Sequence, residues 1–364
     1  MALRLSSAMA DALALVAPGR PLREGIERVL LAKRGALIVI GDDAKVLSIC
    51  TGGFLIDAEY SPQRLTELAK MDGAIILSSD TTRLARANVH LMPDPAVPTT
   101  ETGTRHRTAE RLARSIDVPV VSVSAAMGVI TVYRHDHKHV LQAASRLHDT
   151  VAHGLSVLQR FRQRFDLAVT ALSALEIEDT VTLADVAAVL QPAELLLRVA
   201  EELEPTFIEL GEEAQLLRLQ LLEVVDGVDE VRHLVVRDYL RPQRQGPPAP
   251  DARAESHVLG ALARLSTEEL LDGRKVGAAL GISPGHADLH ASMEPRGYRM
   301  LYRLPRFPDA LADRIVEHFA GLQKIMRASV GDLEQVSGVG ESRARSVKDG
   351  LSRLAEASIL DRYS

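Results

Sequence analysis

Short apolar runs alternate with segments whose apolar residues have helical spacing over the first 145 residues. The apolar runs predict strands at residues 36–40, 46–50, 73–77, 87–92, 118–124 and 129–133. Helical spacing predicts helices at residues 4–31, 61–69 and 108–116, and Pro18, Gly19 and Pro21 divide the first of them. We expect residues 36–40 and 46–50 to form a hairpin. The pattern as a whole predicts an α/β domain with a mixed sheet flanked by helices.

Strand patterns stop near residue 145. Residues 147–239 carry Leu, Val and Ala at helical spacing with few turn residues, which predicts an all-α spine that Pro192 and Pro205 break into several helices. Residues 241–253, rich in Pro, Arg and Gln, predict a linker, and a helical module follows it. The expected domains are therefore residues 1–145, 146–240 and 254–364.

The last module contains an internal repeat with a shift of 32 residues. Residues 336–340 read VSGVG, and the helical pattern after them has the same apolar spacing as the one after residues 304–308. The later copy has the pattern of a helix-hairpin-helix, whose glycines let backbone N–H groups approach a phosphate at the start of a helix. The predicted DNA-binding residues are Gly338, Val339, Gly340, Ser342 and Arg343, within a tandem motif at about residues 300–355.

Such contacts to the DNA backbone carry no sequence information, so the module is expected to bind DNA without sequence specificity. The earlier copy lacks both glycines and is expected to serve packing. The alternative is that residues 336–340 form a helix–turn–helix packing corner with a glycine turn.

Composition and charge narrow the class of protein. The chain has 364 residues, 46% of them hydrophobic, and a formal charge of −6, so it has sizeable cores and is not a basic nucleic-acid coat. Residues 295–364 hold twelve Lys or Arg against nine Asp or Glu, which makes the tail module basic. The single cysteine, Cys50, excludes an intrachain disulfide and is expected to be a small buried residue. With no long apolar segment and no signal-peptide layout, we expect a soluble cytoplasmic protein without membrane contact.

Two short motifs of the sheet domain combine an acid with cations. Residues 72–74 (DGA) open a predicted strand, and residues 103–110 (GTRHRTAE) stand just before a predicted helix, after a proline-rich loop. A helix N-terminus and two guanidiniums supply donors for a polyphosphate. An Asp-Gly pair is also typical of a plain turn, and a charged triplet of a solvated loop. The order strand, stiff loop, basic triplet and helix favours a nucleotide site, although neither a Walker-type loop nor a dinucleotide-binding glycine motif occurs.

Together the two motifs resemble the paired signature of the diadenylate cyclase family. The order of sheet domain, helical spine and terminal hairpins is similar to that of the DNA-scanning members of this family over essentially the whole chain. The resemblance implies that two ATP molecules condense to cyclic di-AMP with release of pyrophosphate, with Mg²⁺ or Mn²⁺ as cofactor. It further implies a nucleoid-associated homo-octamer that binds branched, Holliday-junction-like double-stranded DNA in the response to DNA damage and its repair.

The resemblance also assigns roles to residues. Asp72 is expected at the metal and the 3′-hydroxyl. The implied catalytic residues are Asp72, Arg105, His106 and Arg107. The implied ATP-binding residues are Gly73, Ala74, Leu91, Thr104, Arg105, His106, Arg107, Thr108 and Ser124.

One segment departs from the family pattern. Many members resemble Ser-Gln-Arg-Arg-Asn after the strand at residues 118–124, whereas this chain reads SAAMG from Ser124. Ala126 and Met127 therefore replace two arginines, and fewer cations face the β- and γ-phosphates. This supports an alternative function, that of a catalytically weakened scaffold protein that binds ATP and DNA.

His135, His137 and His139 alternate in sequence and would share one face of a strand, as metal ligands can. We identify no carboxylate or cysteine at ligand spacing on a neighbouring strand. These histidines are therefore expected to form a solvated hairpin tip.

Overall fold

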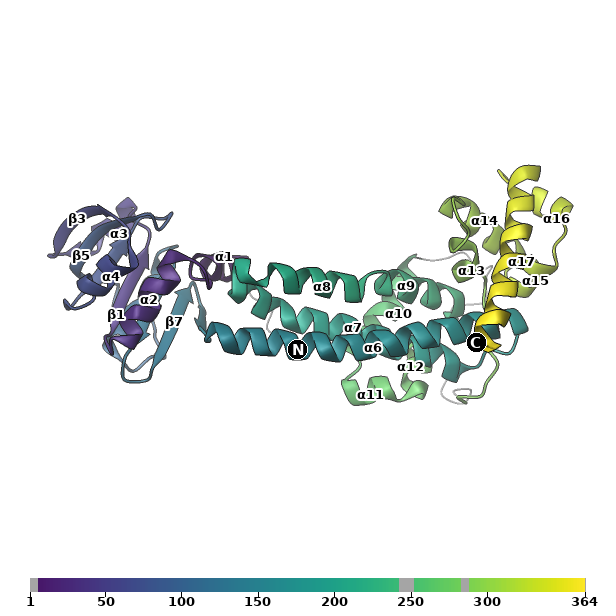
Figure 1. Ribbon diagram of the computed structural model, residues 1–364, viewed down its shortest axis with the longest axis horizontal. Coiled ribbons are helices and arrows are strands. Elements are labelled where there is room, and N and C mark those ends of the chain that lie inside the picture. The colour runs from purple at the N-terminus through teal and green to yellow at the C-terminus, as the bar shows by residue number, and fades with distance from the viewer. Residues whose placement is uncertain (1–5, 242–251, 283–287, 364) are drawn as a thin grey trace. The chain divides into compact units, whose positions relative to one another are not determined.

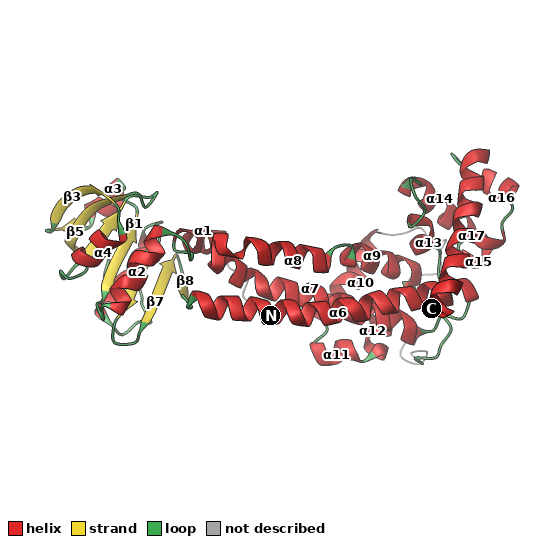
Figure 2. Ribbon diagram, viewed as in Figure 1, coloured by secondary structure: helices red, strands yellow, loops and turns green. Residues whose placement is uncertain are grey.

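The computed structural model describes residues 6–241, 252–282 and 288–363 (Figure 1). Its contacts divide the chain into two compact units, residues 1–154 with 202–220, and residues 155–201 with 221–364. Every named strand of the described part lies between residues 36 and 140, and helices dominate the remainder (Figure 2). The predicted fold class is confirmed. The predicted linker lies almost entirely outside the described residues. None of the helices described is long and apolar enough to cross a membrane.

The first unit is built on one mixed sheet. Its strands are β1 (Ala36–Ile40), β2 (Cys50–Thr51), β3 (Phe54–Glu59), β4 (Ala74–Leu77), β5 (Arg83–Leu91), β6 (Val120–Ser124), β7 (Val129–Arg134) and β8 (His137–Val140). They lie in the order β2-β5-β4-β1-β6-β7-β8, and β3 also pairs with β5. Only β1 and β4 run parallel among the paired strands described. This central pair is buried on both faces, as parallel strands usually are.

Helices cover both faces of the sheet. Helices α1 (Ser7–Leu15), α2 (Pro21–Leu31) and α4 (Pro62–Leu68) share one core with the sheet. Helices α3 (Ala44–Ser48) and α5 (Thr104–Ser115) share the other. Within β1, Ile38 and Ile40 belong to the first core and Leu37 and Val39 to the second, because successive side chains of a strand point to opposite faces. The unit is therefore a three-layer α/β/α sandwich.

Two expectations for this unit are wrong. Residues 46–50 do not form a strand paired with β1, because the Asp43 carboxylate accepts a hydrogen bond from the Val46 N–H (2.9 Å) and caps helix α3. Cys50 begins β2 instead, which pairs with β5, and its side chain is half-buried. The helix expected from residue 108 begins at Thr104. The basic triplet therefore lies in the first turn of that helix rather than ahead of it.

The helical spine comprises α6 (Ala144–Glu178), α7 (Leu183–Leu210), a 3₁₀ turn (Gly211–Ala214), α8 (Gln215–Val225) and α9 (Val228–Tyr239). Pro192 and Pro205 both lie inside α7, so the expected breaks are wrong. A proline in a helix interior costs about 3 kcal/mol. Burial of neighbouring side chains such as Leu190 and Leu196 offsets that cost. The helix ends at Gly211, whose φ of 59° suits a glycine that terminates a helix.

The histidines of the β7–β8 hairpin do not share one environment. His135 and His137 are exposed as expected, but His139 is half-buried, and its Nε2 lies 2.7 Å from Glu209 Oε2. Glu209 of α7 is itself buried and accepts a hydrogen bond from the Gln142 N–H at 2.6 Å. In the part of the chain that the structure describes, no group of three or more His, Cys, Asp or Glu residues could hold a metal ion.

The remaining helices are α10 (Ala252–Arg264), α11 (Thr267–Leu271), α12 (Gly273–Ala279), α13 (Tyr298–Tyr302), α14 (Asp309–Phe319), α15 (Leu322–Arg327), α16 (Val330–Glu334) and α17 (Glu341–Tyr363). The repeat is visible in the structure, because α13 and α16 are each followed by a hairpin and a longer helix at the same shift. Phe307 N–H donates to Leu304 O at 3.3 Å, and Val339 N–H donates to Val336 O at 3.0 Å. The two hairpins therefore share a backbone path.

A buried charged cluster fastens α13 to α6 and α9. Arg299 Nη2 lies 3.0 Å from Glu176 Oε2, and the Tyr239 hydroxyl donates to Glu176 Oε1 at 2.7 Å. The Asp238 carboxylate accepts hydrogen bonds of 2.7 to 2.9 Å from the backbone N–H groups of residues 297–299. Two carboxylates and one guanidinium leave a net negative charge in the core. Burial and the Glu176 charge therefore raise the pKa of Asp238 to about 7.

Candidate functional site

The strands bring the predicted nucleotide-site residues to one edge of the sheet. Strands β1 and β4 both begin at this edge, and β5 and β6, which run antiparallel to them, end there. Asp72 and Gly73 directly precede β4, Leu91 ends β5, and Ser124 ends β6. Residues separated by 52 positions in the sequence thus gather around the starts of two central strands.

Gly73 holds this edge together by close backbone approach. Its φ is 100°, and a Cβ atom there would lie 2.8 Å from the carbonyl carbon of Asn88 and 2.9 Å from Val89 O. The side chain of Ala74, the next residue, is buried in the core shared with α5. Asp72, just before, is exposed. Close packing at Gly73 therefore fixes the backbone of the motif, and the Asp72 carboxylate beside it points to solvent.

Arg105 connects the two motifs. Its Nη2 lies 3.4 Å from Asp72 Oδ1, and its Nη1 would lie only 2.6 Å from a Cβ at Gly35. Gly35 precedes β1 and thus leaves room for the guanidinium to cross the edge of the sheet. Sequence reasoning missed it, because a glycine ahead of a strand is an ordinary turn signal. An exposed ion pair of this kind contributes little to stability, so both groups remain free to bind a ligand.

The residues of the triplet have different surroundings. Thr104 and Arg107 are exposed in the first turn of α5, and Thr108 is half-buried. His106 is only 8% exposed, and its Nδ1 lies 2.7 Å from the Tyr133 hydroxyl. Sequence reasoning assigned no role to Tyr133, which reaches His106 from strand β7.

A carboxylate continues this chain of contacts. The Tyr133 hydroxyl donates to Glu101 Oε1 at 3.0 Å, and Lys138 Nζ donates to the same oxygen at 2.9 Å. Burial opposes ionisation of Glu101, but the hydrogen bonds from Lys138 and Tyr133 prevail and lower its pKa below the ordinary value. These contacts form one series that runs from His106 through Tyr133 and Glu101 to Lys138.

The proline-rich loop between β5 and α5 follows a defined path. The buried Glu110 carboxylate accepts hydrogen bonds from the Thr99 hydroxyl and from the Thr100 N–H, the latter at 3.0 Å. Arg111 donates to Val97 O at 2.9 Å. Burial opposes ionisation of Glu110, but these donors lower its pKa. The loop is therefore tied to the helix whose first turn carries the basic triplet.

The turn between β6 and β7 occupies the position where the family pattern has arginines. Ser124 Oγ accepts a hydrogen bond from the Met127 N–H at 3.3 Å, and the Gly128 N–H donates to Ser124 O at 2.9 Å. Ala126 is exposed, and Met127 is 63% exposed. The turn thus lies at the edge of the site and offers no cation to it.

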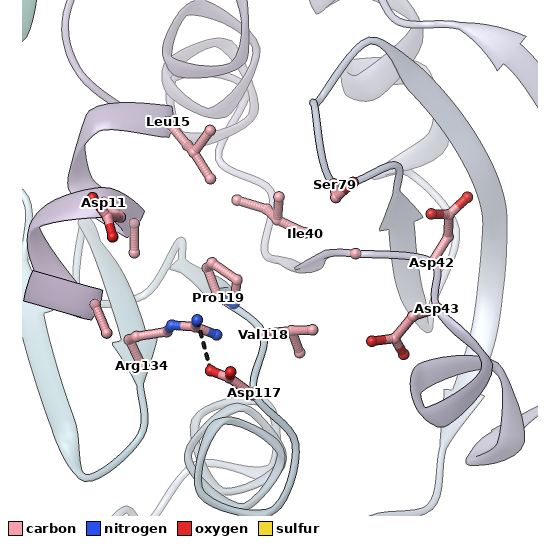
Figure 3. A pocket seen from close by; sticks show the side chains of 13 residues that line it. Asp11, Leu15, Ile40, Asp42, Asp43, Ser79, Asp117, Val118, Pro119 and Arg134 are labelled. Atoms are coloured by element: carbon pink, nitrogen blue, oxygen red, sulfur yellow. Dashed lines mark ion pairs between the residues drawn. The ribbon is translucent and has the colours of Figure 1, made fainter.

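A cavity of about 360 Å³ lies at the opposite edge of the sheet (Figure 3). Its lining includes Asp11, Asp42 and Asp117, and Arg134 Nη2 pairs with Asp117 Oδ1 at 2.6 Å. Its excess of carboxylates repels a triphosphate. The open edge around Asp72 and Arg105, rather than this cavity, is the candidate nucleotide site.

The hairpin at residues 336–340 combines a glycine with positive φ and a backbone position that is open to solvent. Gly338 has a φ of 89°, Val339 is buried, and a Cβ at Gly340 would meet nothing within 4 Å. Arg314 Nη1 donates to Ser337 O at 3.1 Å, and Arg343 Nη1 donates to Gly338 O at 2.9 Å. The two arginines satisfy carbonyl groups and place positive charge beside the start of α17.

The earlier hairpin differs at the decisive positions. Arg306 adopts a φ of 57° at the place of Gly338 in the repeat. Pro308 takes the place of Gly340 and has no N–H to donate. Phe307 is partly buried and packs against the core of this region. This hairpin is therefore suited to packing, as predicted.

Comparison with known proteins assigns the chain to a family. Residues 23–138 match the model described as DisA bacterial checkpoint controller nucleotide-binding, and residues 141–289 match the DisA bacterial checkpoint controller linker region. The DNA integrity scanning protein DisA of Streptomyces coelicolor is 49% identical over 98% of this chain and 94% of its own length. The protein of the same name from Frankia casuarinae is 50% identical over 96% of both chains.

Among solved structures, DacA from Staphylococcus aureus aligns with 40% of this chain and 97% of its own, at 22% identity and a TM-score of 0.28. The sequence relatives span nearly the whole chain, and the matched nucleotide-binding region contains the sheet edge with Asp72 and Arg105. The chain therefore belongs to the DisA family of DNA integrity scanning proteins, and it is a diadenylate cyclase.

Proposed function

We propose that this cyclase condenses two ATP molecules to cyclic di-AMP and two pyrophosphates, and that DNA binding by its C-terminal hairpins is coupled to this synthesis. The observation that carries the first part is the meeting of Asp72 and Arg105 at one open edge of the sheet. An acid and a cation from two motifs stand where one nucleotide can be held by its phosphates and its ribose.

The reaction needs two such edges. The 3′-oxygen of each ATP attacks the α-phosphorus of the other, the bond to the β-phosphate breaks, and pyrophosphate leaves. One site holds one ATP, so a second copy of the chain must face it, and alignment then replaces a chance encounter. Phe54 and Met92, 56% and 58% exposed, lie near the site edge at the start of β3 and directly after β5. These apolar side chains support a face-to-face pair within the proposed homo-octamer.

The charged and uncharged residues of the site have different proposed roles. Arg105 and Arg107 supply the cations for the phosphates, and the hydroxyls of Thr104, Thr108 and Ser124 supply further hydrogen bonds. Gly73, Ala74 and Leu91 would meet the nucleotide through their backbone, because the side chains of Ala74 and Leu91 are buried in the core shared with α5.

A divalent ion fits this edge. Mg²⁺ is commonly bound by one or two carboxylates together with substrate phosphates and water, and Asp72 offers one exposed carboxylate. Mg²⁺ or Mn²⁺, when bound, neutralises triphosphate charge and polarises the α-phosphoryl group. Asp72 is the residue that would hold it.

Incubation of the purified protein with ATP and either metal, followed by chromatography, tests this function. We expect cyclic di-AMP and pyrophosphate from the wild type. Both Asp72→Asn and the double variant Arg105→Ala with Arg107→Ala should abolish product without changing the mass of the oligomer. Asp42→Asn, an exposed carboxylate at the opposite sheet edge, is the matched control and should keep full activity.

Two results would contradict the proposal. Full activity in both site variants would refute the assignment of Asp72 and the triplet. ATP binding by the wild type without product, with either metal, would favour the ATP- and DNA-binding scaffold, for which Ala126 and Met127 provide the physical reason.

The partner of the C-terminal region is inferred from the hairpin. The names of the relatives refer to DNA integrity scanning, which supports DNA as the partner here. Open space at Gly340 and the nearby Arg314 and Arg343 support contact with phosphates. We infer binding of branched double-stranded DNA without sequence specificity, in the cytoplasm and at the nucleoid, by a protein divided at residues 1–145, 146–240 and 254–364.

A further inference from the structure

His106 is a buried histidine of which only one ring nitrogen has a partner. Nδ1 faces the Tyr133 hydroxyl at 2.7 Å, whereas Nε2 is buried and has no hydrogen-bond partner among the described residues. The ring lies between Arg105 and Arg107 in the first turn of α5. Which ring nitrogen carries a proton therefore determines whether His106 offers a ligand a hydrogen-bond donor or an acceptor.

Glu101 fixes the direction of the hydrogen bonds. An ionised carboxylate only accepts hydrogen bonds, and Glu101 Oε1 receives them from Lys138 Nζ at 2.9 Å and from the Tyr133 hydroxyl at 3.0 Å. The single proton of the Tyr133 hydroxyl is thus committed to Glu101. The Tyr133 oxygen must then accept a hydrogen bond from His106, so Nδ1 carries a proton.

The second nitrogen follows from the first. In a neutral imidazole with a proton on Nδ1, Nε2 bears a lone pair and accepts. A Cβ at Gly103 would lie 3.7 Å from His106 Cδ2, the carbon bonded to Nε2. Among the described residues, no other atom beyond the chain neighbours of Gly103 lies within 4 Å of that position, so this edge of the ring borders the free space left by the missing side chain of Gly103.

We propose that Glu101 and Tyr133 are positioning residues that hold His106 in the Nδ1–H tautomer, so that the basic triplet presents two cations and one hydrogen-bond acceptor. The inference rests on the proposed function of this edge as the ATP site. A phosphate oxygen is itself an acceptor and is excluded as the partner of Nε2. A hydroxyl group, such as those of the ribose, is the class of ligand group that fits, and within the triplet Arg105 and Arg107 serve the phosphates.

Magic-angle-spinning NMR of the full chain labelled with ¹⁵N-histidine tests the tautomer directly. His106 can be identified by transfer from ¹³C-labelled tyrosine, because its ring centroid lies 6.1 Å from that of Tyr133. We expect nitrogen shifts of the Nδ1–H tautomer in the wild type and their loss in Tyr133→Phe. An Nε2–H or doubly protonated ring in the wild type would overturn the proposal, and this result needs no variant to fold.

Ligand binding tests the consequence. The probes are α,β-methylene ATP, which cannot be cleaved at the reacting bond, and inorganic tripolyphosphate, which has no ribose. Tyr133→Phe should weaken binding of the first by roughly tenfold. Its binding of tripolyphosphate should stay unchanged. Tyr60→Phe, which removes a hydroxyl bonded to Pro21 O in the same unit, is the matched control and should alter neither.

The outcomes separate this inference from the proposed function. An equal loss of affinity for both probes in Tyr133→Phe would show that His106 serves phosphate and would overturn the acceptor role. An unchanged affinity for α,β-methylene ATP would overturn the positioning role. If the wild type does not bind α,β-methylene ATP, the proposed function fails, and the NMR spectrum still decides the tautomer.

Discussion

Gly73 constrains the nucleotide site more tightly than the charged residues beside it. Its φ of 100° is one that side chains rarely adopt, and the backbone of Asn88 and Val89 occupies the space where a Cβ would lie. Asp72 and Ala74 can therefore stand on opposite sides of this residue, one exposed and one in the core. The position of the exposed Asp72 carboxylate depends on the absence of a side chain at the next residue.

Gly73→Ala should lower the free energy of unfolding by about 2–4 kcal/mol, because backbone strain and steric overlap add together. Gly52→Ala is the matched control, since Gly52 has a φ of 64° but open space around its Cβ position, and it should cost about 1 kcal/mol. Urea unfolding followed by circular dichroism measures both. Equal losses in the two variants would show that the contact with β5 is unimportant.

Part of the site could be predicted at the level of residues. The Asp72 motif and the basic triplet have local patterns, and the structure joins them through Arg105. Tyr133 and Glu101 could not be predicted, because they lie 32 positions apart and only the pairing of the strands and the path of the loop bring them together. A tyrosine in a strand has the same pattern whether its hydroxyl meets water or a carboxylate.

At the scale of elements, the two glycines of the hairpin before α17 differ in what they contribute to it. Gly338 is needed for the turn itself, since its φ is 89° and a Cβ would lie 3.0 Å from Arg314 Nη1. Gly340 has no such restriction, because a Cβ there would meet nothing within 4 Å. A side chain at Gly340 would instead project into the open space where we propose that the DNA backbone binds.

Gly340→Val should therefore weaken binding to a four-way DNA junction by at least about tenfold while leaving basal cyclase activity and thermal stability unchanged. Gly321→Val is the matched control, because Gly321 belongs to the same region and also has open space at its Cβ position. Fluorescence anisotropy with labelled DNA measures the affinity. Junction binding that is as strong in Gly340→Val as in Gly321→Val would favour a mere packing corner.

The elements themselves were predictable where local signals and packing agree. Strand β1 and helix α4 follow their apolar spacing and caps. Residues 46–50 were not predicted correctly, because a single cap at Asp43 selects a helix for an apolar run that suits either structure. Pro192 and Pro205 led us to expect breaks where α7 continues, because burial of side chains along α7 outweighs the local preference of two prolines.

On the scale of the whole molecule, three continuous helices, α6, α7 and α8, carry the chain between its units. Helix α6 passes from the first unit to the second after residue 154, and α7 returns to the first at residue 202. The buried cluster of Glu176, Asp238 and Arg299 then joins the hairpin region to α6 and α9 within the second unit. We propose that coupling between DNA binding and cyclic di-AMP synthesis passes along these helices.

This cluster should make stability depend on pH in a defined direction. The pKa of Asp238 is about 7 in the folded protein and about 3.9 in an unfolded chain. The folded state therefore holds a proton that the unfolded chain has lost, and the stabilisation is full below about pH 4 and is lost as the pH rises to about 7. The free energy of unfolding should fall by at most about 1.4 kcal/mol per pH unit within this window.

Urea unfolding midpoints measured across this window test the assignment. Asp238→Asn removes the ionisable group and should flatten the dependence relative to the wild type. Asp272→Asn, which changes an exposed helix cap in the same unit, should keep the wild-type slope. A slope that is unchanged in Asp238→Asn would assign the proton to another group.

The same cluster limits what can be learned from deleting the C-terminal region that we propose to bind DNA. A chain cut after residue 240 keeps Glu176 and Asp238 but loses Arg299 and the three backbone N–H groups that Asp238 accepts from. Two carboxylates shaped for burial would then stand at the cut end of the spine without a counter-charge. A change of cyclase activity in such a shortened protein would therefore combine two effects, damage to the spine and the loss of the proposed DNA contact. A single substitution at Gly340 leaves this cluster intact and is therefore the cleaner test of whether the proposed DNA contact changes cyclase activity.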